Sequence, residues 1–251
     1  MFATTLIILV VAAVVTSTIS AILGMAGGIL LQVVMLMQLP LLTVVPLHGA
    51  IQLCSNGTRL GVYFRDMERR IVGRFAIGAL FGGVVGWMFL NRVAPEPNSP
   101  TERVLEAILG LVILGTTFLP TPKLKHGIGN NLYVLVGVGA ACIGILLGAV
   151  GPFIAPFFIR EGMVKERLIA TKAACQLLCH VVKIPTFIAW GFDFVPYTWF
   201  LLAMFGAVVL GTLIGRRLLK YVSPRAFTIA VKVLLALAAL KLVTGFKLPG
   251  A

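Results

Sequence analysis

Long apolar runs alternate with short charged or proline-rich segments along the whole chain. A membrane-spanning helix needs about 20 mostly apolar residues, whereas strands of a membrane barrel show shorter segments of alternating hydrophobicity. The runs therefore predict helices packed in lipid. The expected segments are Thr5–Leu23, Gly28–Leu39, Val44–Leu60, Ile71–Leu90, Val104–Leu119, Leu132–Leu147, Pro152–Ile159, Leu168–Ile184, Val195–Ile214 and Pro224–Val243.

The two halves of the chain align without a gap at an offset of 124 residues. Leu23-Gly24-Met25-Ala26-Gly27-Gly28 lies over Leu147-Gly148-Ala149-Val150-Gly151-Pro152. Such self-similarity at a fixed offset indicates an internal duplication. We predict a first membrane repeat over residues 1–121 and a second over residues 122–251, which together form one integrated domain.

Each predicted repeat contains a long segment, a glycine-rich break, a short apolar piece and three further segments. The short pieces cannot span a bilayer, so they are expected to be half-helices near the membrane midplane. Irregular backbone at that depth has to be shielded by protein. The predicted fold class is therefore an all-α polytopic membrane protein with broken helices.

Loop charge predicts that the second repeat is inverted. The chain has 21 Lys and Arg against 8 Asp and Glu, a formal charge of +13. With five elements per half, 15 basic residues fall on one side of the membrane and 5 on the other. Cytoplasmic loops are the basic ones, so we expect both termini outside. The charge is then an orientation signal, and nucleic acid is not an expected partner.

Composition excludes a soluble enzyme, because 59% of residues are hydrophobic and 12% are charged. Cys54, Cys142, Cys175 and Cys179 all fall inside apolar runs, which favours buried small hydrophobes over a disulfide framework. No second Cys or His pair completes a tetrahedral site beside Cys175, Cys179 and His180. We predict no metal and no cofactor.

A polar stripe follows each break and carries the strongest functional signal. His48, Gln52, Asn56 and Arg59 share one helical face. The matching positions of the second half hold Lys172, Gln176, His180 and Lys183. An inversion would set the two stripes against each other.

The stripes predict a substrate that is a small oxyanion. No Asp or Glu falls in the middle of a predicted segment, and Glu106 is the nearest, about one turn from an end. Half-helix N-termini at the breaks would add backbone N–H groups for an anion. The predicted substrate-binding residues are Gly24, Gly27, Gly28, His48, Gln52, Asn56, Gly148, Gly151, Lys172, Gln176 and His180, with Arg59 and Lys183 as further anion-attracting residues.

Several alternatives remain open at this stage. Arg59, Lys172 and Lys183 could snorkel to the headgroups, and the amides could only bond neighbouring helices. The histidines could couple protons to transport, and Lys232 stays unassigned. Gly78, Gly82 and Gly86 could pack internally or against a second subunit, so a homodimer is open.

The duplicated Leu-Gly-x-x-Gly-Gly/Pro element, followed each time by a short helix and an Ala-x-Gln-Leu segment, resembles the TauE/SafE sulfite exporter family. The resemblance covers nearly the whole chain. It implies a bacterial inner-membrane transporter of sulfur-containing anions such as sulfite, or of organosulfonates such as sulfoacetate. The chain departs from the family pattern at Met25, Ala26 and Pro152.

We therefore expect a secondary anion transporter, and most readily an exporter, that works by alternating access. The rivals are a transporter of another small anion, an intramembrane enzyme and a non-transporting membrane scaffold or assembly factor. An enzyme would need a nucleophile and a base, but the adjacent Cys179 and His180 diverge by about 100° on a helix. A scaffold would need no central polar stripe.

Overall fold

The structure is a computed structural model. It describes residues 2–23, 27–93, 96, 99–118, 129, 131–148, 150–160, 163, 165–218 and 224–245. Within these ranges the chain is α-helical and contains no β-strand. The prediction of an all-α fold is confirmed.

The helices follow the predicted segments closely. The first half contains α1 (Phe2–Leu23), α2 (Gly27–Leu36), α3 (Leu41–Tyr63), the short 3₁₀ helix η1 (Phe64–Asp66), α4 (Arg69–Val93) and α5 (Pro100–Phe118). The second half contains α6 (Leu132–Leu147), α7 (Gly151–Arg160), α8 (Lys165–Ala189), η2 (Val195–Tyr197), α9 (Thr198–Leu218) and α10 (Pro224–Thr244).

The helix bounds support the predicted duplication. The half-helices α2 and α7 have 10 residues each, and both of their ends differ by the offset of 124. The same offset separates the starts of α3 and α8 and the starts of α5 and α10. The predicted boundary between residues 121 and 122 lies outside the described residues, so the division into two repeats stays a prediction.

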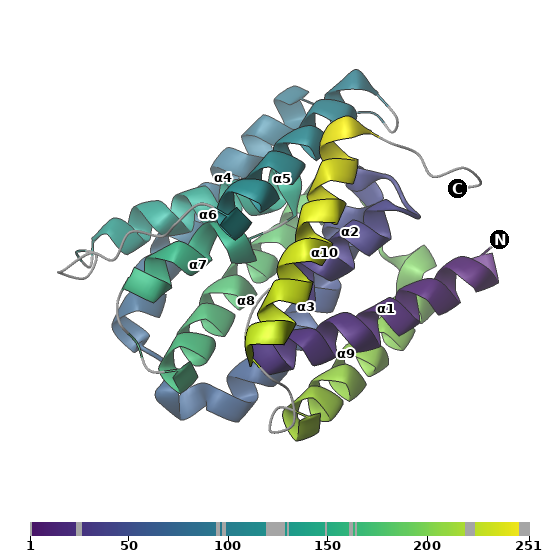
Figure 1. Cartoon of the computed structure of the whole chain (residues 1–251). Coiled ribbons are helices and arrows are strands. Elements are labelled where there is room, and N and C mark those ends of the chain that lie inside the picture. The colour runs from purple at the N-terminus through teal and green to yellow at the C-terminus, as the bar shows by residue number, and fades with distance from the viewer. Residues whose placement is uncertain are drawn as a thin grey trace.

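The most extensive helix contacts each join a helix of the first half to a helix of the second half. The helix α1 packs along α9, and its counterpart α6 packs along α4 (Figure 1). The equivalent helices α3 and α8 pack on each other, as do α5 and α10. A two-fold relation between the halves produces this pairing, so the pairing supports the predicted duplication.

The central helices α3 and α8 run antiparallel. Gly49, early in α3, approaches the side chain of Lys183, late in α8. Arg59, near the end of α3, interacts electrostatically with Lys172, near the start of α8. Equivalent helices that run in opposite directions are what inverted repeats require. The antiparallel pair therefore supports inversion.

Glycines allow the closest helix contacts. A Cβ at Gly78 or Gly82 of α4 would meet the backbone of α6 at Val134 or Val138, and Gly86 packs on the same helix. Gly211 of α9 likewise faces the backbone of α1, where Thr18 Oγ1 donates a hydrogen bond of 3.0 Å to the Gly211 carbonyl. The glycine stripe of α4 is thus occupied within the chain and lends no support to a homodimer.

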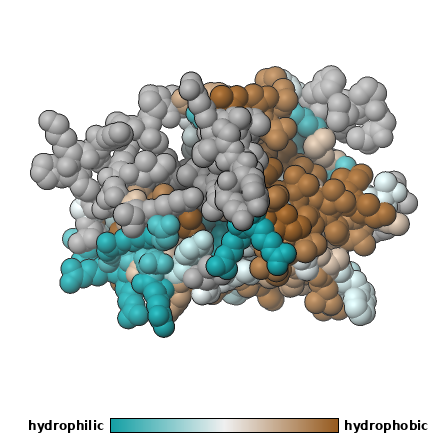
Figure 2. All heavy atoms as spheres, turned by 60° about the horizontal axis from the view of Figure 1, so that its bottom comes forward, coloured by the Kyte–Doolittle hydropathy of each residue, from teal (hydrophilic) through white to brown (hydrophobic). Residues whose placement is uncertain are grey.

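Four of the described helices are long and apolar enough to cross a membrane, namely Ala3–Ala21, Arg69–Val93, Glu166–Ala189 and Val195–Leu218. The outer surface of α4 exposes Phe81, Val84 and Met88. Figure 2 shows one face on which hydrophobic residues cover a broad area while hydrophilic residues gather in another. These properties are those of a multi-pass membrane protein whose surface faces lipid.

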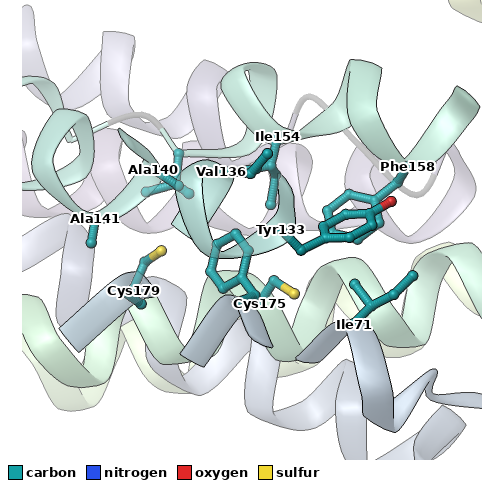
Figure 3. Close-up of a cluster of buried hydrophobic side chains, with 12 residues drawn as sticks. Ile71, Tyr133, Val136, Ala140, Ala141, Ile154, Phe158, Cys175 and Cys179 are labelled. Atoms are coloured by element: carbon teal, nitrogen blue, oxygen red, sulfur yellow. The ribbon is translucent and has the colours of Figure 1, made fainter. Parts of the chain in front are cut away.

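A buried apolar cluster joins α4, α6, α7 and α8 and supports one side of the central pair. Figure 3 shows Tyr133 beside Phe158, with their rings tilted by 30°, and the Cys175 and Cys179 sulfur atoms turned into the cluster. Both thiols are free and buried. Their placement agrees with the prediction that they are small buried hydrophobes.

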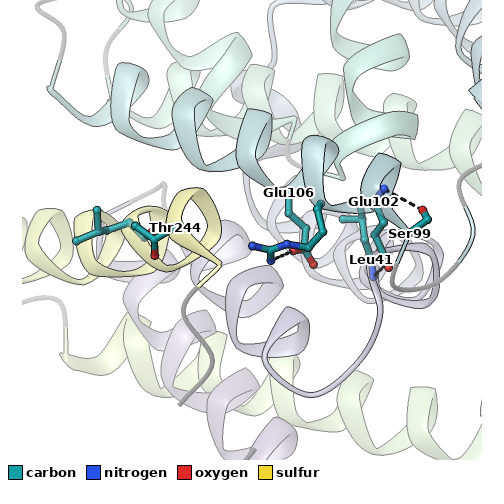
Figure 4. Close-up of polar contacts among 7 residues, drawn as sticks. Leu41, Ser99, Glu102, Glu106 and Thr244 are labelled. Atoms are coloured by element: carbon teal, nitrogen blue, oxygen red, sulfur yellow. Dashed lines mark hydrogen bonds and ion pairs between the residues drawn. The ribbon is translucent and has the colours of Figure 1, made fainter. Parts of the chain in front are cut away.

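Helix α8 continues to Ala189, five residues past its predicted end at Ile184, and a second difference from the predicted segments is the start of α5. This helix begins at Pro100, four residues before the predicted start, so Glu106 lies nearly two turns inside it. Ser99 accounts for the earlier start, because its hydroxyl accepts a hydrogen bond of 3.2 Å from the Glu102 N–H (Figure 4). The Glu102 carboxylate in turn accepts a 2.6 Å bond from the Leu41 N–H, which caps α3.

Candidate functional site

The first break leads into α2 and contacts the stripe of α3. Gly24 lies outside the described residues, while Gly27 and Gly28 open the half-helix. A Cβ on Gly28 would lie 3.1 Å from the Gln52 amide, so the absence of a side chain lets the glutamine reach the helix start. The Gly28 carbonyl accepts a hydrogen bond of 2.8 Å from His48 Nε2.

The second break repeats this contact. Gly151 opens α7, and a Cβ there would lie 2.9 Å from Gln176 Nε2. Gly148 ends α6 with φ of 82°, a left-handed conformation that favours glycine. In both halves, therefore, a stripe glutamine packs on a glycine in the first turn of a half-helix, although Gly27 itself faces Thr16 and Ser20 of α1.

Gln32 completes the second break and was not predicted. It lies on α2 and is fully buried, and its Nε2 donates a hydrogen bond of 2.5 Å to the Leu147 carbonyl at the end of α6. A side chain of the first half thus donates the hydrogen bond that a carbonyl at the break of the second half requires. A lone amide within an otherwise apolar half-helix was the sequence signal that could have identified it.

Three cations of the stripes are buried. The exposed fraction is 9% for Arg59, 5% for Lys172 and 0% for Lys183. A residue that only snorkels to the headgroups keeps its charged end in water. The burial therefore disfavours snorkelling for these three residues.

Arg59 and Lys172 form one group with two polar residues of α3. Arg59 donates hydrogen bonds of 3.2 Å to Asn56 Oδ1 and 3.0 Å to Ser55 Oγ. Its Nε and the Asn56 Nδ2 have no hydrogen-bond partner among the described residues. Lys172 brings a second positive charge to the same end of the pair.

Lys183, His48 and His180 form the other group. The Lys183 ammonium donates a hydrogen bond of 3.1 Å to the Gly148 carbonyl, at the negative end of α6. The two imidazole rings meet edge to face, with centroids 6.4 Å apart. The Nδ1 atoms of both rings are buried without a partner among the described residues.

The ion pairs found within the described ranges lie away from the stripes. The ion pairs between described residues join Arg103 to Glu106 and Arg167 to Glu68, and neither includes a stripe cation. No group of three His, Cys, Asp or Glu residues within the described ranges has the placement of a metal site. The stripes thus gather positive charge without a protein counter-charge in the described ranges.

Comparison with protein families decides the class. The family model described as Sulfite exporter TauE/SafE matches residues 9–242. The chain belongs to the TauE/SafE sulfite exporter family. Neither the search of curated proteins nor the search of solved structures found a match.

The TauE/SafE match covers both breaks and both stripes, from Gly24 to Lys183. Membership makes the chain a multi-pass membrane protein of a family of anion exporters and confirms the resemblance seen in the sequence. It also favours a transporter over an enzyme. The roles of the individual stripe residues stay predictions.

Proposed function

We propose that this protein exports small sulfur-containing anions, such as sulfite or organosulfonates like sulfoacetate, by alternating access across the bacterial inner membrane, with both termini outside. The observation that carries the proposal is the contact made in each half between a break glycine and a stripe glutamine, Gly28 with Gln52 and Gly151 with Gln176.

The chemistry of this contact favours an anion. A half-helix that begins at a glycine presents free backbone N–H groups and the positive end of its dipole. The glutamine amide beside it adds a further donor. An oxyanion is the ligand that such a set of donors binds best.

Charge in the surrounding stripes supports the same substrate. Taking a cation out of water costs several kcal/mol unless a counter-charge compensates it. Arg59, Lys172 and Lys183 are buried and form no ion pair with a described residue. A bound anion would supply the missing counter-charge.

The helix arrangement supports alternating access. The site lies between α3 and α8, which belong to different halves and run antiparallel. Small rotations of one half against the other would open one end of this pair and close the opposite end. The anion would stay between the halves during that change.

The test is sulfite efflux from proteoliposomes. Gln52→Ala and Gln176→Ala each remove an amide donor from a break, and we expect efflux at least tenfold below wild type, since one lost charge-assisted bond is worth about 1.5–3 kcal/mol. Gln38→Ala is the matched control, because Gln38 is exposed between α2 and α3. Equal efflux in all three variants would contradict the proposal.

A further inference from the structure

Two groups of buried donors lie along the α3 and α8 pair. We name them by their main cations: the Arg59 station contains Arg59, Lys172, Asn56 and Ser55, and the Lys183 station contains Lys183, His48 and His180. We infer that these are two separate anion-binding stations, an inference that rests on the proposed anion transport. One chain would then bind two small anions, rather than one anion held between both groups.

The distance between the stations is the first argument. The Arg59 guanidinium bonds to Ser55 and Asn56, so it lies level with those residues of α3. The Lys183 side chain passes Gly49, where a Cβ would lie 2.8 Å from its Cδ. Six to seven residues of helix separate the two levels, which is about 10 Å.

A sulfite ion is shorter than this separation. Its oxygens lie about 2.5 Å apart, so the ion with a hydrogen bond of about 2.9 Å at each end reaches about 8 Å. That length does not extend to both cation groups. One sulfite ion therefore occupies one station.

Unpartnered donors make the Arg59 station a binding site in its own right. Arg59 and Lys172 are buried like charges that interact electrostatically. Arg59 Nε and Asn56 Nδ2 have no partner among the described residues. Two close cations repel each other unless an anion lies between them, and the free donors supply hydrogen bonds to that anion.

The Lys183 station has its own unused groups. Lys183 gives one of its three N–H groups to the Gly148 carbonyl, and the other two have no partner among the described residues. The Nδ1 atoms of His48 and His180 are buried beside it and have no partner among the described residues. His180 Nδ1 can donate to an anion, whereas His48 Nδ1 is an acceptor in the neutral ring, whose Nε2 donates to the Gly28 carbonyl. This group requires no residue of the Arg59 station.

The glutamines lie between the stations. Gln52 is one turn after His48 and one turn before Asn56, and Gln176 has the corresponding place on α8. An anion that leaves one station would therefore meet the glutamines and the half-helix starts before it reaches the other. Each change of the transporter from one open state to the other would load one station and empty the other.

Binding stoichiometry tests the inference. We would measure equilibrium binding of radiolabelled sulfite to the full chain in nanodiscs of zwitterionic lipid. Wild type is expected to bind two sulfite ions per chain. Arg59→Gln combined with Lys172→Gln is expected to bind one, and Lys183→Gln, which keeps a donor for the Gly148 carbonyl, is also expected to bind one.

A matched control variant and a second station variant distinguish loss of a binding station from loss of charge or of folding. Arg216→Gln combined with Lys232→Gln removes the same charge from exposed positions and should still bind two. Asn56→Asp places a carboxylate 3.2 Å from Arg59, so it should occupy the Arg59 station permanently, lower the stoichiometry to one and raise the melting temperature. It keeps the inference testable if the double glutamine variant fails to fold.

The outcomes separate this inference from the proposed function. One sulfite per chain in wild type, with efflux that still depends on Gln52 and Gln176, would overturn the two stations and leave the transporter intact. Loss of all binding in a folded single-station variant would show a shared site and would also overturn it. No binding of sulfite or sulfoacetate to wild type, together with no efflux, would overturn both.

Discussion

The carboxylate of Glu102 should stabilise the helix that carries the first stripe. It accepts a 2.6 Å hydrogen bond from the Leu41 N–H at the start of α3, and its exposed fraction is 3%. The residue before that helix is Pro40, which provides no side-chain cap. Glu102 therefore satisfies a helix donor that α3 itself leaves open (Figure 4).

Replacement of Glu102 by alanine removes this cap without a substitute. A hydrogen bond to a charged group is worth about 1.5–3 kcal/mol, and an N-cap about 0.5–2 kcal/mol. We therefore expect Glu102→Ala to lower the free energy of unfolding by about 2–3 kcal/mol. Glu102→Gln keeps an acceptor oxygen but loses the charge, and about 1 kcal/mol is expected.

The assay is thermal unfolding of purified protein, with Glu106→Ala as the control in the same helix. One kcal/mol shifts the melting temperature by about 2–4 °C for chains of this size, so Glu102→Ala should lower it by about 4–12 °C. Glu106 pairs with the half-exposed Arg103, an interaction worth about 0–1 kcal/mol. Equal shifts in the two alanine variants would refute the role of Glu102 as a buried cap.

Three further predictions concern packing, the second break and pH. Gly82→Ala should destabilise the protein by about 1–3 kcal/mol, because its Cβ would meet the α6 backbone, whereas Gly206→Ala at the repeat-equivalent position has open space and should be neutral or stabilising in the same thermal assay. Gln32→Leu should cost about 1–3 kcal/mol, since the Leu147 carbonyl loses its donor, and the exposed Gln38→Leu should change the melting temperature little. One of the two sulfite ions should bind more weakly as pH rises. His48 Nε2 donates to the Gly28 carbonyl, so the Nδ1 of the neutral ring is an acceptor and favours an anion that still carries its own proton. Lys183 and His180 of α8 face the same ring, and titrations of His48→Gln would show whether the pH dependence belongs to it.

Hydropathy and repetition gave most of the fold. The ends of α6 at Leu132 and Leu147 coincide with the predicted segment, because a glycine with positive φ stops the helix after an uninterrupted apolar run. The start of α5 was missed, since the run begins only at Val104 while the helix begins at the Ser99 cap. The residue that signals this start is polar, and hydropathy does not detect it.

The sequence predicted the two polar stripes of the candidate site, but it did not predict which residues the stripes contact. Helical spacing placed His48 and Gln52 on one face, and the structure brings both to the half-helix that starts at Gly27. The contact of Gln32 with the Leu147 carbonyl joins residues 115 positions apart. No local pattern encodes such a contact, because it depends on how the two halves pack.

The stripes also differ between the halves in a way that bears on the transport cycle. Of the four repeat-equivalent pairs only Gln52 and Gln176 are identical, while Arg59 corresponds to Lys183, His48 to Lys172 and Asn56 to His180. If inversion exchanges the two ends of the site, the ends bind the same anion with different affinity. Unequal affinity cannot set the direction of net flux, because a passive site has to obey the same equilibrium from both sides. The direction follows the gradient of the anion and of any coupled ion. The difference in affinity sets the anion concentration at which each end of the site becomes occupied. The Arg59 station has two cations, and within the described ranges its Asn56 Nδ2 and Arg59 Nε have no partner. It should therefore load at the lower sulfite concentration, and the Lys183 station should release the anion more readily.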